Sequence, residues 1–260
     1  SNSNKDAIAA GLQALMVWGM RVGVEFAELF EDRQLSNDCK AAEKKLVKAA
    51  SKVYKKFLAS CPAPDAPGSK QVTALMTITG LIDAPKADKE FLSINGAQGF
   101  STFYGYYMLE AMAMAGNYQG ALDVIREYWG AMIDLGATSF WEDFDINWIP
   151  NAAPIDELVP EGKKDIHGDC GAYCYVGFRH SLCHGWASGP TSWLSRHILG
   201  VEVIEPGCRQ VRITPHLGDL QWVKGTFPTP YGELQIYHEK QANGNVISEV
   251  KAPKGVSVIK

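Results

Sequence analysis

The spacing of apolar residues in the first 60 positions is typical of two long amphipathic helices. Apolar side chains recur at intervals of three and four from residue 5 to 33, and the pattern returns from 38 to 60 against a lysine-rich face. This predicts a helical hairpin. The stretch CPAPDAPGSK interrupts the pattern with three prolines and a glycine, and QVTALMTITGLI then predicts another helix.

A second helical hairpin is predicted near the middle of the chain. Residues 101–115 and 118–134 both show helical spacing, and Gly116 and Asn117 join them. A polar loop follows Pro150 and runs to about residue 165. A last helix is expected to begin near Pro190, whose fixed φ suits a first helical turn, and to end at Gly200.

The periodicity changes after residue 200. The segments RQVRITP, GELQIYHEK and VSVIK alternate apolar and polar residues, and the turn signals EPG, PTPYG and NGN separate such segments. Residues 201–260 are therefore expected to form several antiparallel strands. The chain is predicted to be mainly α with a β tail.

Composition and charge limit the kinds of partner. The chain has 260 residues, of which 46% are hydrophobic and 21% charged, so it can build a large core or two domains. Its formal net charge of -4 gives no electrostatic reason to expect a nucleic acid or an anionic membrane, and a neutral polar substrate fits better.

The amino-terminal segment bears on membranes and targeting. The longest apolar stretch, AIAAGLQALMVWGM, carries Gln13 and is soon followed by Arg21, so we expect it to be too short to cross a bilayer. The chain opens with SNSNKDA, and no secretory signal follows. The compartment stays undetermined, with a periplasmic or secreted location favoured over a cytoplasmic one.

Cysteines and histidines are dense in HGDCGAYCYVGFRHSLCHGW. Cys170 and Cys174 have the spacing of one half of a structural zinc site, but no second pair follows at the usual distance. Buried thiols that serve as small apolar residues are the preferred interpretation, with a disulfide or a metal as alternatives. Neither a metal nor another cofactor is expected.

The segment GATSFWEDFDINW places Glu142, Asp143 and Asp145 among aromatic residues. Carboxylates beside aromatic rings could form a sugar-handling surface. Alternatively, the acidic residues could cap the next helical turn while the aromatic rings pack in a core. The residues of this segment alone leave both interpretations open.

Three segments carry a resemblance to a known family. They are STFYGYYMLEAMAMAGNYQGALDVIREYWGAMIDLGATSFWE, SLCHGWASGPTSWLSRHILGVEVIEPGCRQVRITP and LQWVKGTFPTPYGELQIYH, and together they resemble the carboxy-terminal part of bacterial α-L-rhamnosidases of glycoside hydrolase family seventy-eight. The resemblance covers roughly residues 70–260. It implies part of an (α/α) barrel of six helical hairpins over residues 1–200, followed by an antiparallel β-sandwich over residues 201–260.

The resemblance also implies a site. Rhamnosidases of this family invert the anomeric centre, which requires one carboxylic acid and a second carboxylate that activates water. Glu142 matches the general base, and Trp141 beside it would pack on the apolar face of the sugar. Asp143 would keep the surroundings of the base polar. His184 and Trp186, in SLCHGW, match positions that line the sugar site, so a rhamnose-containing glycan or glycoside is the expected partner.

The sequence departs from the family in one respect. The acidic, arginine- and tryptophan-containing motif that holds the general acid does not occur, and about 200 helical residues suffice for about half of the barrel. The chain therefore resembles a piece of a larger enzyme that supplies the general-base half of the site.

Half a barrel has a consequence for assembly. We expect either the missing barrel half or a homo-oligomer to cover the apolar flanks around Trp18 and Tyr107. The alternative is that the first 70 residues fold back and close a smaller ring. For function, another (α/α)-barrel glycosidase or lyase and a non-catalytic carbohydrate-binding or scaffold fragment remain alternatives.

Overall fold

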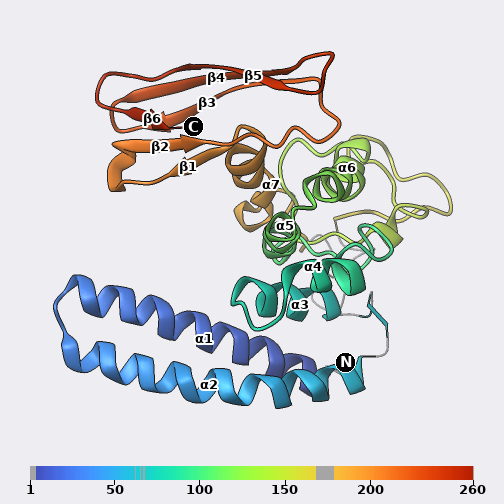
Figure 1. Cartoon of the computed structure of the whole chain (residues 1–260). Helices are drawn as coiled ribbons and strands as arrows, with labels where there is room; N and C mark the ends of the chain where they lie inside the picture. Colours follow the sequence, from blue (N-terminus) through green and yellow to red (C-terminus); the bar gives the residue numbers. More distant parts are fainter. Residues whose placement is uncertain (1–3, 62, 65, 67, 168–178, 260) are drawn as a thin grey trace.

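The computed structural model describes residues 4–61, 63–64, 66, 68–167 and 179–259 (Figure 1). Within these residues a helical region is followed by a small β region. The α-helices are α1 (Lys5–Leu29), α2 (Arg33–Ser60), α3 (Ser69–Ile78), α4 (Ala84–Ala87), α5 (Gly105–Met114), α6 (Tyr118–Asp134) and α7 (Gly189–Trp193). The strands are β1 (Val201–Val203), β2 (Gln210–Ile213), β3 (Trp222–Thr229), β4 (Gly232–Lys240), β5 (Val246–Lys251) and β6 (Ser257–Ile259).

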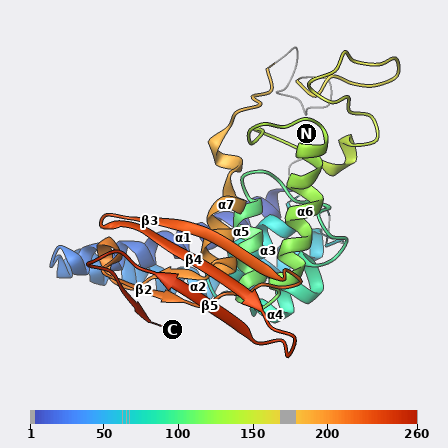
Figure 2. The same cartoon turned by 90° about the horizontal axis from the view of Figure 1, so that it is seen from above.

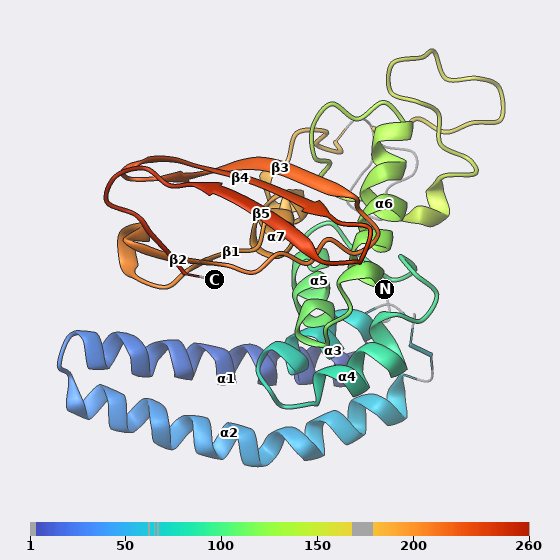
Figure 3. The ribbon, with the colours of Figure 1, turned by 45° about the horizontal axis from the view of Figure 1, so that its top comes forward.

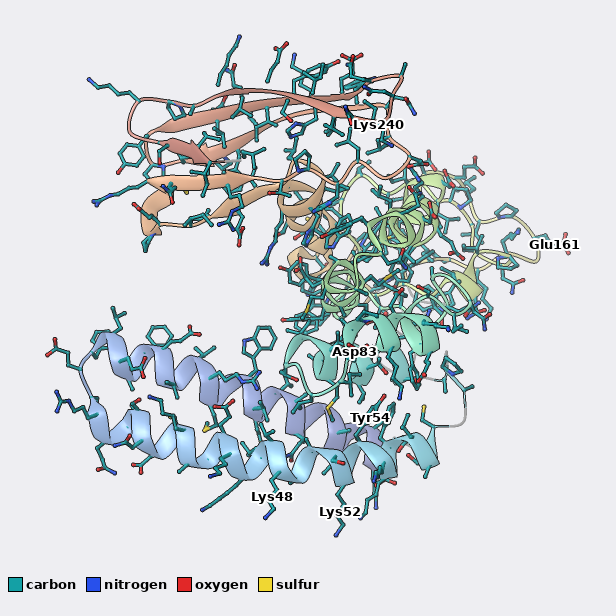
Figure 4. All side chains as sticks on the ribbon, in the orientation of Figure 1. Lys48, Lys52, Tyr54, Asp83, Glu161 and Lys240 are labelled. Carbon is teal, nitrogen blue, oxygen red and sulfur yellow. The ribbon has the colours of Figure 1, made fainter. Side chains whose placement is uncertain are left out.

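Helices α1 and α2 form the first predicted hairpin. The side chain of Asn4 caps α1 and that of Asp32 caps α2, each by accepting hydrogen bonds from backbone N–H groups of the first turn. The face of α1 buried in the fold is rich in small side chains, which allow close approach of its neighbours: Ala7, Ala10, Gly11, Ala14, Val17 and Ala27. Lys48 and Lys52 lie on the outer face of α2 and point away from α1 (Figure 4), as the amphipathic pattern predicts.

The polar residues of α1 tie the hairpin together. Gln13 donates through Nε2 to the carbonyl of Leu46 at 2.5 Å, and Arg21 pairs through Nε with Glu43 at 2.7 Å. The guanidinium of Arg21 also donates to the carbonyl of Thr79 beyond α3. These contacts give both polar residues partners inside the fold.

The expectation that the apolar stretch of α1 is too short for a membrane is wrong on length. The helix has 25 residues, and its most apolar 18-residue window reaches a mean hydropathy of 1.4, which is enough by length and composition alone to cross a membrane. Core helices and signal sequences meet the same criterion. Only 22% of that window is buried in the fold.

The second hairpin, α5 and α6, forms the centre of the helical core. Asn117, which joins the two helices, caps α6 by accepting a hydrogen bond from the N–H of Gly120. The buried side chains of this core include Met108, Leu109, Met112, Leu122 and Trp129. Helix α3 lies between this pair and the α1–α2 hairpin (Figure 1).

The helices do not close a ring. The turn between α1 and α2 extends far beyond α3 and α5, on the side of the molecule where the β region also lies (Figures 1 and 3). Seen from above, the β strands lie over the outer part of this hairpin, at a different level (Figure 2). The alternative, in which the first 70 residues fold back to close a smaller, incomplete ring, stays a prediction.

The β region consists of two three-stranded sheets, in the orders β1-β2-β6 and β3-β4-β5. The strands were expected to be antiparallel, and three of the four pairings between them are antiparallel. The exception is β6, which pairs with β2 in parallel, Val211 opposite Val258. The reason is that the chain leaves β5 in one sheet and crosses to the other before it forms β6, so no hairpin turn sets its direction. Apolar residues of both sheets, among them Val211, Ile213, Leu234 and Ile236, share one core.

The β region is joined to the helical region by polar contacts, a buried one at His238 and an exposed ion pair at Arg126. His238 of β4 is fully buried, and its ring lies 2.7 Å from the hydroxyl of Ser248 and 3.1 Å from the carbonyl of Leu199. Arg126 of α6 pairs with Asp219 at 2.8 Å, ahead of β3. Gly200 has φ +72°, and a Cβ there would lie 2.3 Å from the backbone of Thr214, so only glycine fits this connection.

The joint at His238 predicts a loss of stability in acid. Burial lowers the pKa of His238 from its usual value of 6.5, against a smaller opposite effect of the Leu199 carbonyl. The unfolded chain therefore binds a proton that the folded chain excludes, and the free energy of unfolding should fall as the pH drops below about 6.5. His238→Gln should reduce this dependence in urea unfolding at pH 7.5 and 5.5. The pKa of His216 is also lowered by burial, so His216 should still contribute its own part of the pH dependence. An unchanged pH dependence in His238→Gln would contradict this account.

Candidate functional site

Glu142 is anchored to the segment that follows the undescribed residues. Its N–H donates to the carbonyl of Ser181 at 2.9 Å, and its carboxylate oxygen Oε2 accepts from the N–H of Ser181 at 3.1 Å. The two residues thus exchange hydrogen bonds, and the half-buried carboxylate of Glu142 lies against the backbone of this segment.

The carbonyl of Glu142 collects two further donors. The hydroxyl of Thr102 donates to it at 2.6 Å from the turn before α5, and the indole N–H of Trp186 donates to it at 2.7 Å. Three parts of the chain that are about 40 positions apart in sequence therefore meet at one residue.

His184 and Trp186 lie on the same side as this anchor. The N–H of His184 donates to the carbonyl of Phe140 at 2.7 Å, and its ring centroid lies 4.3 Å from that of Trp186. Trp186 is 48% exposed and neighbours Phe103, which is 40% exposed, at a ring separation of 5.8 Å. The structure thus brings together Glu142, His184 and Trp186, three of the residues expected at the site.

Trp141 is not part of an open surface, so the expectation that it stacks on a sugar is wrong. Its side chain is 0% exposed, and its ring packs against Phe144 and His180. Neighbouring residues of an extended segment point to opposite sides, so when Glu142 faces Ser181, Trp141 must face the core. Its indole N–H has no hydrogen-bond partner among the described residues.

The surroundings of Asp143 also differ from the polar, hydrated surroundings that were expected. It is half-buried, its Oδ1 accepts from the N–H of Phe144, and its own N–H donates to Nε2 of His180 at 3.0 Å. Burial raises the pKa of Asp143, and the negative charges of Asp145 and Glu142 add to that rise. Asp145, by contrast, is exposed and caps the turn Ile146–Trp148, as the simpler interpretation of the segment suggests.

Sequence reasoning missed two residues that hold the site. His180 is buried, with its Nδ1 2.8 Å from the carbonyl of Ile166, so its hydrogen-bond partners place the proton on Nδ1 and leave Nε2 to accept from Asp143. The sequence singled out His180 only as a member of a dense cysteine and histidine stretch. Thr102 carried no signal at all, because its role depends on a contact 40 residues away.

The metal and thiol interpretations concern partly undescribed residues. Cys170 and Cys174 lie outside the residues that the structure describes. Where side chains are described, no group of three potential metal ligands is found, and Cys39, Cys61, Cys183 and Cys208 form no disulfide. The ring of His167 lies 2.7 Å from a carboxylate oxygen of Asp165.

Comparison with known proteins shows what the chain is similar to. Residues 200–259 match the family model of the bacterial alpha-L-rhamnosidase C-terminal domain. No curated protein sequence matches the chain.

Solved structures extend the likeness beyond the β region. The family 78 rhamnosidase of Bacillus sp. GL1 is similar over 93% of this chain, with a TM-score of 0.69 and 23% identity. The α-L-rhamnosidase of Aspergillus terreus is similar over 94%, with a TM-score of 0.69 and 18% identity. The α-L-rhamnosidase of Streptomyces avermitilis, solved with L-rhamnose, is similar over 95%, with a TM-score of 0.65 and 17% identity.

The resemblance to the carboxy-terminal part of α-L-rhamnosidases is therefore confirmed. The matched structures share the fold of nearly the whole chain, helices followed by small sheets. The chain spans only 25%, 27% and 22% of the lengths of these three proteins. At these identities the likeness concerns the fold, and the activity of the site is a separate question.

The different burial of the two tryptophans gives a direct test of the site's geometry. Trp141→Ala should lower the free energy of unfolding by about 3 to 5 kcal/mol, because it leaves a large cavity in the core. Trp186→Ala should cost about 0.5 to 1.5 kcal/mol, mainly the hydrogen bond to the Glu142 carbonyl. Urea unfolding followed by circular dichroism measures both. Equal losses for the two variants would contradict the assigned burial.

Proposed function

We propose that this chain is the carboxy-terminal part of a glycoside hydrolase that removes terminal α-L-rhamnose by an inverting mechanism, and that Glu142 is its general base. The observation that carries the proposal is that the exposed Trp186 donates through its indole N–H to the backbone carbonyl of Glu142, and that the Trp186 ring lies 4.3 Å from the ring of His184. The matching C-terminal domain and the rhamnosidase folds support the choice of rhamnose as the sugar.

Each group has a chemical role in this proposal. The ionised carboxylate of Glu142 takes a proton from a water molecule, which attacks the anomeric carbon from the face opposite the leaving oxygen. The hydrogen bond from Ser181 to Oε2 fixes the direction of the carboxylate. His184 supplies a ring nitrogen for the sugar hydroxyls, and Trp186 packs on the apolar C–H face of the sugar.

The second carboxyl group is expected from outside the described site. Asp143 has the raised pKa of a general acid, but it follows Glu142 directly in one loop and turns toward Phe144 and His180. An inverting pair flanks the sugar from opposite faces, about 6.5 to 9.5 Å apart. We therefore assign Asp143 a role in supporting the loop, and we expect the general acid to come from further polypeptide that joins this chain.

This assignment predicts that the 260-residue chain alone does not hydrolyse aryl α-L-rhamnosides, since a missing general acid costs orders of magnitude in rate. In an assembled enzyme that holds both carboxyl groups, Glu142→Gln should lower kcat by a factor of about a hundred or more and change KM little. Glu157→Gln, in an exposed loop of the same chain, is the matched control and should leave kcat unchanged. Near-normal turnover by Glu142→Gln would remove Glu142 from the base role.

The exposed face of α1 supports the expectation that further polypeptide covers the apolar flanks of the chain. Apolar side chains recur along it at spacings of four and three, and we call this set the α1 seam: Ile8, Leu12, Leu15, Val22, Phe26 and Leu29. All are exposed except Val22, which is half-buried. Such spacing fits one further helix packed along α1. In an assembled enzyme the remaining barrel helices would cover the seam, and in the chain alone a second copy would.

Self-association of the isolated chain is therefore predicted. Light scattering at high concentration should show an oligomer, and the double variant Leu12→Asp with Phe26→Asp should be monomeric, because charges on the seam oppose its burial. Ile133→Asp, on the exposed side of α6, should not change the mass. A wild-type chain that stays monomeric and binds no hydrophobic dye would contradict the proposal.

One alternative has a specific observation in its favour. The described site offers a single suitably placed carboxylate. A fragment that binds carbohydrate without cleaving it would need no second one. Under that alternative, sugars would bind but no assembly with further polypeptide would restore hydrolysis. Another (α/α)-barrel glycosidase would instead cleave a different member of a panel of aryl glycosides.

A further inference from the structure

Positive charge is concentrated on one helix of the chain. Helix α2 carries eight basic residues and only two acidic ones, whereas in the whole chain 29 acidic residues outnumber 25 basic ones. The net charge of -4 therefore conceals a basic helix on an otherwise acidic molecule. Six lysines of α2 make up what we call the lysine face: Lys44, Lys45, Lys48, Lys52, Lys55 and Lys56.

The lysine face is exposed and points away from the rest of the fold. Lysines recur every four positions from Lys44 to Lys56, so they follow one side of the helix over about 18 Å. The buried Phe57 lies on the opposite side of α2. Figure 4 shows Lys48 and Lys52 pointing outward, and no other helix or strand lies beyond α2 on that side (Figures 1 and 4).

The charges of the lysine face are not neutralised within the described part of the fold. Lys40, one turn before the face, pairs with Glu28 of α1 at 2.7 Å, but none of the six lysines takes part in an ion pair among the described residues. Like charges four positions apart on a helix repel each other and weaken the helix. An anionic surface outside the chain would relieve this repulsion.

The shape and composition of the lysine face favour a flat partner. The face is the convex side of a helix at the edge of the molecule, so a planar surface can reach all six lysines, whereas a single polymer chain would need a groove to do so. The face holds no arginine to bind phosphate groups in bidentate fashion and no aromatic ring on which nucleic-acid bases could stack. Clusters of lysines on a helix are attracted to anionic head groups without any fixed geometry.

We propose that the lysine face binds the anionic head groups of a lipid membrane and holds the chain against the membrane surface. The attraction is electrostatic and requires no insertion, because small residues such as Ser51 and Ala59 accompany the lysines on this side of α2. Lys48, Lys52 and Lys56 line one shallow hollow with these two residues. This inference concerns attachment of the chain and does not depend on the role of Glu142.

Co-sedimentation of the 260-residue chain with lipid vesicles tests the proposal. Vesicles of phosphatidylcholine with about one third phosphatidylglycerol should bind the chain, and vesicles of phosphatidylcholine alone should not. Raising the NaCl concentration from about 0.05 M to about 0.5 M should release the chain, because salt screens the attraction between exposed charges.

A variant of the lysine face locates the binding. We combine four substitutions to glutamine, which keeps a good helix former at each position: Lys44→Gln, Lys48→Gln, Lys52→Gln and Lys55→Gln. Binding to the anionic vesicles should weaken at least about tenfold, since each lysine near an anionic surface contributes roughly a fivefold gain in affinity. Circular dichroism confirms that α2 is still folded.

A matched control removes the same number of charges elsewhere. It combines substitutions of four exposed lysines outside α2: Lys86→Gln, Lys89→Gln, Lys224→Gln and Lys251→Gln. The control should retain binding within about threefold, because its charges lie outside the lysine face and are largely screened.

Three results would overturn the proposal. Equal binding to neutral vesicles would mean that apolar groups of the chain hold it on the lipid. Equal losses in the two variants would mean that only the net charge matters. Absence of binding to the vesicles, together with lysine-dependent binding to duplex DNA or to heparin, would mean that the partner is a polyanion and not a membrane. Hydrolysis by Glu142 is tested separately, so each of these results leaves the proposed function as it stands.

Discussion

The backbone of Glu142 holds the candidate site together. Its N–H and carbonyl bind Ser181, Thr102 and Trp186, which come from two other parts of the chain. These hydrogen bonds fix which side chains of the segment face outward. Glu142 is directed to the Ser181 backbone, so Trp141 on its other side must enter the core, and Trp186 must lie over the carbonyl it binds. The arrangement of carboxylate, histidine and open aromatic ring follows from this one set of contacts.

The sequence predicted the elements well where the pattern was local. The two hairpins, the connection through Gly116 and Asn117 and the strand around Gln210–Ile213 all depend on residues close in sequence, and the structure has them. The direction of β6 could not be predicted, because its partner β2 lies in the other part of the β region and no turn links the two. Gln13 and Arg21 suggested that the apolar stretch of α1 is short. In the structure both residues lie within one long helix, where they contact α2 and the end of α3.

The site was predicted less completely, for a physical reason. Family resemblance pointed to Glu142, His184 and Trp186, and the structure brings these three together. The resemblance could not show that Trp141 is buried. The sequence of an aromatic residue beside a carboxylate is the same whether the ring faces a ligand or the core. Thr102 and His180 support the loop through contacts 37 to 40 positions away, and such contacts leave no local pattern.

We propose above that the surface around Glu142 and Trp186 binds a terminal rhamnose. A titration of the ¹⁵N-labelled chain with L-rhamnose, followed through the tryptophan indole N–H signals by NMR, tests it most directly. The Trp186 signal should shift in a saturable way, while the signals of the buried Trp141 and the distant Trp222 should shift little. A titration in which the Trp186 signal stays in place, or in which only Trp222 responds, would contradict it.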